Sequence, residues 1–474
     1  MRKRHKSKVF ENLTIIDTAS KGKTIAKTQE GIPVFLSEGV PGDVVDVRTL
    51  KKRKGFFEGK IEAFHKRSDR RTEPVCAHFG SCGGCKWQHM SYAAQLEFKH
   101  KEVQENLKRI GGISVGQTLP ILGCDTPYFY RNKMEFSFSS NRWMTPEEIK
   151  SDKPFDKNAL GFHKPGMWDK IVDIEKCHLQ AEPSNAIRNE IRRYAIEHQL
   201  PFFNPKDQSG FLRSLMLRTT STGEIMVLLQ VVHDSASLLP LLDHIKTEFP
   251  MITSLLYVIN NKANDTLYDQ TVLLHSGRDY IVEVMEDLRF KIGPKTFYQT
   301  NSLQALALYK IARSLAQITP EDIVYDFYTG IGTIAQFVAH QAKKVIGVDV
   351  VPESIEAAKK NAKENGINNV AFEAGDMKSI FDADFVRRHG KANVVITDPP
   401  RDGMHKAVVA QLLALAPERI VYVSCNSATQ ARDLALLNED YKLVKTQAID
   451  MFPQTHHVEN IVLLEKKRIN AILV

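Results

Sequence analysis

Cys425 is the residue of this chain whose type and position most suggest a nucleophile. It follows a strand-like run at residues 419–424, and an earlier run at 393–397 ends in Asp398-Pro-Pro-Arg401. If the two runs form neighbouring parallel strands, the thiol and the carboxylate share the rim where open α/β sheets bind ligands. A Cys at a strand end is also often a small buried hydrophobic residue, so simple packing is the competing interpretation.

A glycine-rich loop follows another predicted strand, residues 323–327, and could bind a nucleotide-like cofactor. The loop reads Tyr328-Thr-Gly330-Ile-Gly332-Thr333. Its glycines allow a tight turn and a close approach to a ligand. Continued to Ala335, the string also fits a dinucleotide-binding fingerprint, which is a weak signal when it stands alone. Asp326 before the loop and Asp398-Pro-Pro on a later strand instead favour the methyltransferase version of the fold, which binds S-adenosylmethionine.

Two further acidic residues are placed to recognise such a cofactor. Asp349 ends the next predicted strand, 19 residues after Gly330. A carboxylate at that point can accept hydrogen bonds from ribose hydroxyls. Asp376 follows the third strand and could reach an adenine amino group.

Glu459 is the available partner for Cys425 in a methyl transfer to carbon. C5 of uracil is too weak a nucleophile to take a methyl group directly, but a thiolate that adds at C6 gives C5 enolate character. A base must then remove the C5 proton before the thiolate can leave. Glu459 alone would be unremarkable, since a Glu at a strand start is usually solvated. His456 and His457 could bind a metal, although adjacent histidines rarely hold one ion together.

A cysteine cluster near the N-terminus indicates a metal site of its own. Cys76, Cys82 and Cys85 follow one another at short spacing. Three thiolates at this spacing suit an iron–sulfur cluster or a structural zinc ion. A fourth ligand is needed, and Cys124 and Cys177 are the candidates.

The elements that must position these groups divide the chain into three expected domains. Residues 6–65 predict five short strands and an OB-like barrel, at 12–16, 22–26, 32–35, 43–47 and 56–63. Residues 66–290 predict an α+β domain with one or two helices besides a helix over 92–110, which could pack on the catalytic domain. Residues 291–474 predict a doubly wound α/β domain. Its strands are expected at 323–327, 344–350, 370–373, 394–397, 420–424 and 458–465, and its helices at 304–316, 334–341, 353–365 and 407–415.

Charge is concentrated at the N-terminus. The chain carries a formal net charge of +8, and residues 1–60 alone hold 14 Lys or Arg and 7 Asp or Glu. A basic module on a nearly neutral body suggests a phosphate-rich partner, although short Lys/Arg clusters are often only solvated tails. No apolar stretch approaches the ~20 residues of a membrane span, and no signal-peptide core follows the basic start. A cytoplasmic protein without a membrane partner is expected.

Together these motifs resemble the RNA uracil-5-methyltransferases, in particular those that act on large-subunit (23S) ribosomal RNA. The resemblance covers nearly the whole chain and identifies the barrel as an RNA-binding TRAM domain. It implies a [4Fe–4S] cluster held by Cys76, Cys82, Cys85 and Cys177, the last within Glu175-Lys-Cys177-His-Leu. It also implies that Glu459 is the proton-abstracting base.

The remaining family motifs are present with small departures. Phe297-Tyr-Gln299-Thr-Asn301 matches a segment that implies contact of Gln299 with cofactor or uracil. Thr333 stands where the family usually has Asn, Asp349 where Glu is common, and Ser427 where Pro usually follows the nucleophile motif. The loop at Asp398 lacks the Cys typical of cytosine methyltransferases, which favours uracil.

The resemblance also implies a substrate. A barrel together with four cysteines argues for ribosomal rather than transfer RNA, and a loop or single-stranded uridine is expected because the base must be splayed out. A monomer is expected. Two alternatives stay open: a transfer-RNA uracil methyltransferase, and a non-catalytic RNA-binding factor in ribosome assembly.

Overall fold

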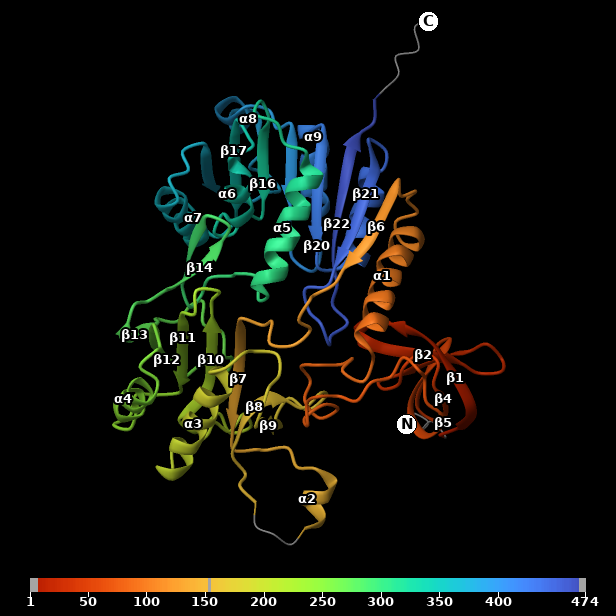
Figure 1. Ribbon diagram of the computed structural model, residues 1–474, viewed down its shortest axis with the longest axis vertical. Helices are drawn as coiled ribbons and strands as arrows, with labels where there is room; N and C mark the ends of the chain where they lie inside the picture. The colour runs from red at the N-terminus through yellow and green to blue at the C-terminus, as the bar shows by residue number, and fades with distance from the viewer. Residues whose placement is uncertain (1–6, 152–154, 469–474) are drawn as a thin grey trace, which may run out of the picture.

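The computed structural model describes residues 7–151 and 155–468 of the chain. They form a small barrel, a central sheet with helices and a larger C-terminal sheet (Figure 1). The C-terminal sheet lies at the top of that view, above the central sheet and the barrel. No helix within the described residues is both long and apolar enough to cross a bilayer.

The N-terminal part is a closed barrel with strand order β1-β2-β3-β5-β4. Its strands are β1 (Val9–Ala19), β2 (Lys23–Lys27), β3 (Pro33–Leu36), β4 (Val44–Arg53) and β5 (Phe56–Lys66), with a short 3₁₀ turn η1 (Ser20–Gly22). Alternate side chains such as Ile15, Val34 and Val47 are fully buried inside, as the two-residue period of a strand requires. The barrel predicted from the sequence is confirmed.

The central part is a seven-stranded mixed sheet with the order β13-β12-β11-β10-β7-β8-β9. The strands are β7 (Lys133–Ser139), β8 (Ala159–His163), β9 (Ile171–Asp173), β10 (Leu212–Thr219), β11 (Ile225–Val231), β12 (Ser254–Ile259) and β13 (Leu273–Gly277). Its helices are α2 (Pro146–Lys150), α3 (Ser184–Glu197) and α4 (Leu238–Glu248). The sequence predicted one or two helices in this part, whereas the structure has three. The short helix α2 is a single turn that begins with a capping box at Thr145. A hairpin of β14 (Ile281–Met285) and β15 (Leu288–Ile292) leads to the C-terminal part.

The C-terminal part is an eight-stranded sheet with the order β18-β17-β16-β19-β20-β22-β21-β6. Its strands are β16 (Ile323–Phe327), β17 (Lys344–Asp349), β18 (Val370–Ala374), β19 (Val394–Thr397), β20 (Arg419–Ser424), β21 (Tyr441–Ile449), β22 (Glu459–Lys466) and β6 (Gln117–Leu122). The pairs from β18 to β20 are parallel, and β22 is antiparallel to both of its neighbours. The mostly parallel α/β sheet predicted from the sequence is confirmed.

Helices cover both faces of this sheet. One core contains side chains of α5 (Ser302–Ala316), α6 (Thr333–Ala339) and α7 (Pro352–Glu364). The other contains side chains of α1 (Tyr92–Arg109), α8 (Ala383–His389), α9 (Lys406–Leu415) and α10 (Ser427–Leu437). Successive residues of β16 alternate between them, with Val324 in the first core and Tyr325 in the second. The sheet is therefore buried on both faces, as a parallel sheet must be.

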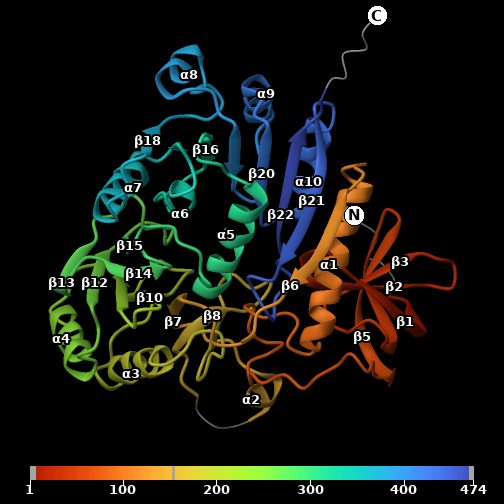
Figure 2. The same ribbon diagram turned by 45° about the horizontal axis from the view of Figure 1, so that its top comes forward.

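Residues early in the chain complete this C-terminal sheet. The helix α1 lies along it (Figure 2), and Asn106 of α1 donates a 2.8 Å hydrogen bond to the Ser427 hydroxyl of α10. The strand β6 then adds to the edge, parallel to β21. The sequence predicted the helix over 92–110 but not the edge strand, because that pairing joins segments more than 300 residues apart.

Candidate active site

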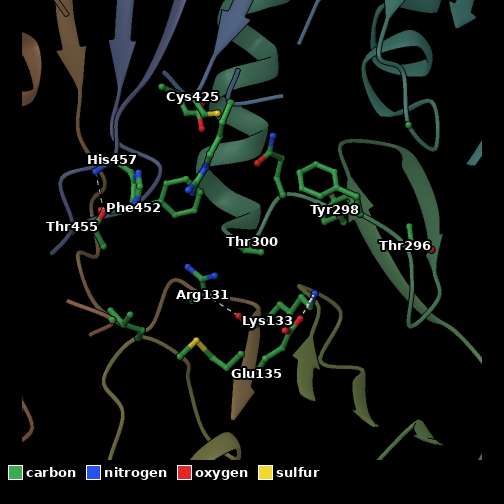
Figure 3. Close-up of a pocket in the computed structure, with 18 of the residues that line it drawn as sticks. Arg131, Lys133, Glu135, Thr296, Tyr298, Thr300, Cys425, Phe452, Thr455 and His457 are labelled. Atoms are coloured by element: carbon green, nitrogen blue, oxygen red, sulfur yellow. Dashed lines mark hydrogen bonds and ion pairs between the residues drawn. The ribbon is translucent and has the colours of Figure 1, made fainter. Parts of the chain in front are cut away.

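A large cavity lies between the rim of the C-terminal sheet and the central part (Figure 3). Its volume is about 1470 Å³, which exceeds the roughly 300–1,000 Å³ of an ordinary small-molecule site. Cys425 faces the cavity from the sheet, and Arg131 and Lys133 lie across from it in Figure 3. The cavity is therefore large enough for a cofactor and a substrate base together.

Cys425 and Glu459 meet in this cavity because two adjacent strands end there. Cys425 is the first residue after β20, and Glu459 is the first residue of the antiparallel strand β22. Ser424 is the register partner of Asn460, which puts the thiol and the carboxyl at the same end of the pair. Both residues line the cavity.

The Asp398-Pro-Pro-Arg401 loop is bonded to the residues that follow the nucleophile. The carbonyl of Arg401 accepts hydrogen bonds of 3.1 Å from the Asn426 amide and from the Thr429 hydroxyl. Asn426 also caps α10 by accepting from the Ala428 N–H at 3.1 Å. The loop and the nucleophile therefore keep a fixed relation.

Three acidic groups of the site hold their protons more tightly than usual. The pKa of Glu459 is raised to about 8, first by burial and then by the charge of Asp398. Burial raises the pKa of Asp398 to about 7. The pKa of the Cys425 thiol is raised to about 12 by burial, then by Glu459 and Asp398, and Arg401 acts against them. The thiolate is therefore favoured when Glu459 and Asp398 are neutral and Arg401 is near.

The glycine loop is held by two carboxylates. Asp326 is fully buried, and its Oδ2 accepts hydrogen bonds from the Thr329 hydroxyl at 2.6 Å and the Ala335 N–H at 3.0 Å. Asp349 accepts from the Gly330 N–H at 2.9 Å and the Val351 N–H at 2.9 Å. The loop is thus fixed to the ends of β16 and β17.

Gly332 has a packing role within this loop. Its φ is +78°, and a Cβ at this position would lie 2.7 Å from the ring of Phe372. Tyr328 also has a positive φ, of 63°, which is uncommon for a residue with a side chain. The loop backbone is therefore strained where it meets the cavity.

The structure brings most of the residues singled out from the sequence to the cavity wall. Those that line it are Gln299, Tyr328, Gly330, Thr333, Asp349, Asp398, Cys425 and Glu459. Gly332 and Asp376, which the sequence also singled out, are not among the described residues that line the cavity. Asp376 lies exposed after β18, where its carboxylate accepts from the Lys378 N–H at 3.0 Å and its charge acts on Tyr328.

Cys76, Cys82, Cys85 and Cys177 line the other end of the same cavity. They are close enough to act on one another, because the pKa of Cys82 is raised to about 12 by burial and further by Cys177 and Cys76. Cys124 is buried in a small cluster against which Cys85 and Cys177 also pack, but it does not line the cavity, and its thiol donates to the Thr126 carbonyl at 3.2 Å. Within residues 7–151 and 155–468, no three His, Cys, Asp or Glu side chains converge as a single metal ion would require.

Several cavity residues carried no signal in the sequence. Arg131 and Lys133 belong to the central part, where no motif marked them. Tyr309 of α5 is buried and its hydroxyl lies 3.4 Å from that of Thr333. Phe452 also lines the cavity, as does His457, which the sequence indicated only as a possible metal ligand. Their nearness to Val458-Glu-Asn460 could have indicated both as site residues.

A parallel sheet with this glycine loop, its two carboxylates and a facing Cys–Glu pair defines a Rossmann-like methyltransferase. A family model described as tRNA (Uracil-5-)-methyltransferase matches residues 269–467. An uncharacterized RNA methyltransferase of Bacteroides thetaiotaomicron is 52% identical over 94% of this chain and 99% of its own length. One of Porphyromonas gingivalis is 51% identical over 95% and 99%. The chain belongs to the RNA uracil-5-methyltransferase family.

A solved structure resembles the chain over almost its full length. The Pyrococcus abyssi tRNA (uracil-54, C5)-methyltransferase in complex with S-adenosyl-L-homocysteine is 28% identical, with a TM-score of 0.74. The match covers 95% of this chain and 100% of that one. The barrel is longer than the unmatched 5% of this chain, so at least part of the barrel is covered by the match to that transfer-RNA enzyme. The barrel alone therefore does not distinguish ribosomal from transfer RNA.

Proposed function

We propose that this enzyme methylates C5 of a uridine in 23S ribosomal RNA, using S-adenosylmethionine, with Cys425 as nucleophile and Glu459 as base. The observation that carries the proposal is the facing placement of Cys425 and Glu459 at the end of β20 and β22, in one cavity with the glycine loop. This is the arrangement that methyl transfer to a pyrimidine carbon needs, since one group must add to the ring and another must take a proton from it.

The proposed reaction balances within the site. The Cys425 thiolate would form a bond to C6, and the displaced π electrons would form the bond from C5 to the methyl carbon. The bond from that carbon to the sulfonium sulfur would break, with S-adenosylhomocysteine as the leaving group. Glu459 then takes the C5 proton, the freed electron pair restores the C5–C6 double bond, and the C6–S bond breaks to return the thiolate. Glu459 must be ionised for this step, so its raised pKa of about 8 makes it a stronger base than an ordinary carboxylate.

The cofactor residues fit a nucleoside with a sulfonium group. S-adenosylmethionine would supply an electrophilic methyl group. The Asp349 carboxylate lies at the cavity wall beside Gly330 and would accept hydrogen bonds from the ribose hydroxyls. Tyr328 and Thr333 line the space next to it. The S-adenosyl-L-homocysteine complex of the Pyrococcus relative supports the same cofactor here.

Asp398 and Gln299 are the proposed contacts to the uracil edge. Both line the same cavity as Cys425, and the charge of Asp398 acts on the Cys425 thiol. Asp398 has a pKa raised to about 7 by burial, so it can donate a proton to a hydrogen bond as well as accept one. Asn132 donates to the Gln299 carbonyl at 3.0 Å, which fixes this segment against the central part.

The four cysteines are proposed to hold a [4Fe–4S] cluster with a structural role. Cys76, Cys82, Cys85 and Cys177 line one end of the cavity and influence one another's ionisation, whereas Cys124 is bonded elsewhere. Four thiolates without a carboxylate are the donor set of such clusters. Zinc is the alternative metal.

Transfer RNA is the second candidate substrate, because the Pyrococcus enzyme of the same organisation acts on it. In support of RNA in general, the barrel strand β4 carries an exposed run at Lys51–Arg53, which can contact phosphates. In either RNA the uridine would have to be flipped out to enter the cavity.

The deciding experiment uses the purified enzyme with radiolabelled S-adenosylmethionine. Unmodified 23S ribosomal RNA and unmodified transfer RNA are offered in parallel, and the product nucleoside is identified after digestion. Labelled 5-methyluridine in the 23S RNA alone is the expected result. Label in transfer RNA alone would favour the second candidate, and RNA binding without label in either would favour the non-catalytic assembly factor.

A further inference from the structure

Residues 450–458 connect β21 to β22 and end directly at Glu459; we name them the base loop. Phe452, Thr455 and His457 of this loop line the cavity, and Figure 3 shows them below Cys425 in that view. The conformation of the base loop therefore determines the position of the Glu459 carboxyl in the site.

The first five residues of the base loop are each bonded to the rest of the protein. The carbonyls of five consecutive residues, from Asp450 to Gln454, each accept a hydrogen bond from outside the loop. The donors, in order, are Gln304 at 2.8 Å, Asn301 at 3.0 Å, Lys99 at 3.1 Å, Tyr130 at 2.9 Å, and the N–H groups of Lys86 and Trp87 at 2.9 and 3.0 Å. A loop held at each successive carbonyl has little freedom of its own.

Gln95 of α1 bonds to Gln454 through both ends of its side-chain amide. Its Nε2 donates to the Gln454 side chain at 3.0 Å, and its Oε1 accepts from the Gln454 backbone N–H at 2.9 Å. The same Nε2 donates to the carbonyls of Trp87 at 3.1 Å and Met90 at 2.9 Å. Gln454 has a φ of +67°, a left-handed conformation that a residue with a side chain keeps only when its surroundings enforce it.

Lys99, one helical turn further along α1, forms the second connection. Its ammonium group lies 2.7 Å from the Asp450 carboxylate, and both side chains are fully buried. Lys99 also reaches the Phe452 carbonyl, and Asp450 accepts from the Phe452 N–H at 3.0 Å. A buried ion pair is sensitive to the loss of one partner, because the other charge is left unpaired.

A helix that only packs on a sheet would use apolar side chains, as α1 does with Val103 and Leu107. Gln95 and Lys99 instead direct buried polar groups at the backbone that leads to the base. We propose that Gln95 and Lys99 are positioning residues for the proton-removal step, acting through Gln454 and Asp450 on the placement of Glu459. This inference rests on the proposed function.

The test compares Gln95→Met and Lys99→Met, which keep side-chain length and remove the polar contacts. The controls are Gln104→Met and Lys108→Met, the same substitutions at exposed positions of α1. Each protein is incubated with S-adenosylmethionine and unmodified 23S or transfer RNA, whichever the wild type methylates. The measured quantities are turnover and the fraction of enzyme in a denaturant-stable adduct with RNA.

A displaced base slows release of the thiolate but leaves its addition intact. We expect Gln95→Met and Lys99→Met to lose about tenfold or more in turnover, with a rise in adduct, while both controls match the wild type. The affinity for S-adenosylhomocysteine should stay unchanged in all four. Wild-type turnover in both variants, or lower turnover without a rise in adduct in folded protein, would overturn the inference.

Two further variants distinguish failure of this inference from failure of the proposed function. If the two α1 variants do not fold, Gln454→Gly is the alternative, because it suits the left-handed backbone, removes the side-chain contact to Gln95 and keeps the bond from the residue-454 N–H to Gln95. No rise in adduct in Gln454→Gly would refute the part of the inference in which Gln95 acts through the Gln454 side chain. Glu459→Gln is the positive control for trapping. If Glu459→Gln itself gives no adduct, the proposed function fails, whereas trapping there and not in the α1 variants refutes only this inference.

Discussion

Cys425 and Glu459 lie opposite each other at one end of the antiparallel pair β20–β22, because Ser424 is paired with Asn460. The pairing couples the two groups electrostatically, since Glu459 raises the pKa of the Cys425 thiol. An ionised Glu459 therefore opposes formation of the thiolate. Once the sulfur is bonded to the substrate it carries no charge, and it no longer opposes ionisation of Glu459. This order of charges suits addition first and proton removal second.

Replacing Glu459 by Gln should stop the reaction after methyl transfer. The amide is nearly isosteric but cannot take the C5 proton, so the bond between Cys425 and the uracil ring persists. We expect a denaturant-stable protein–RNA adduct that carries one labelled methyl group per RNA, detected on a denaturing gel. Turnover should fall by about 10²–10⁴-fold, the usual contribution of a general base. Cys425→Ala in the same background should abolish the adduct, and an adduct that survives it would contradict the assignment of the nucleophile.

The pH dependence of adduct resolution should report the ionisation of Glu459. Burial and then Asp398 raise its pKa to about 8, so the basic form grows as pH rises from 7 to 9, and the resolution rate should rise with it. Asp398→Asn removes a negative charge that opposes ionisation, so the pKa of Glu459 falls and the rising limb should move to lower pH. Burial remains the larger cause, which keeps the limb above the ordinary value of 4.5. Single-turnover rates across pH test this, and a limb that stays in place or moves to higher pH would contradict it.

Gly332→Ala should weaken both folding and cofactor binding. The substitution places a Cβ 2.7 Å from Phe372 in a backbone with φ of +78°. We expect about 1–3 kcal/mol less stability against urea and a weaker affinity for S-adenosylhomocysteine by calorimetry. Gly366→Ala is the matched control, since Gly366 has a φ of +68° but nothing within 4 Å of the added Cβ. Equal losses in both variants would mean that backbone conformation, and not the contact with Phe372, sets the cost.

Local patterns explain why much of the C-terminal sheet was predictable. Short apolar runs identified β16, β17, β19 and β20, and with them the rim that carries Asp349, Asp398 and Cys425. The helix α10 was missed because its start at Asn426 is hidden in the nucleophile motif, where Asn426 serves as its cap.

Long-range contacts explain what the sequence could not give. Nothing near Gln95 or Lys99 indicates that they bond to residues 359 and 351 positions away. Arg131 and Lys133 enter the cavity because the central sheet faces the rim, an arrangement that no local spacing encodes. The cofactor contact of Asp376 stays a prediction: its position after β18 suggested it, and its carboxylate accepts a hydrogen bond from the Lys378 N–H in its own turn.

The identity of the fourth cysteine ligand gives the last prediction. Cys177 lines the cavity and acts on Cys76 and Cys82, whereas the Cys124 thiol donates to the Thr126 carbonyl. Protein purified without oxygen should therefore be brown and contain iron and inorganic sulfide. Cys177→Ala should lose most of this iron and Cys124→Ala should keep it, by metal analysis and visible absorption. Retained iron in Cys177→Ala with loss in Cys124→Ala would reverse the assignment, and stoichiometric zinc in colourless wild-type protein would replace the cluster with a structural zinc site.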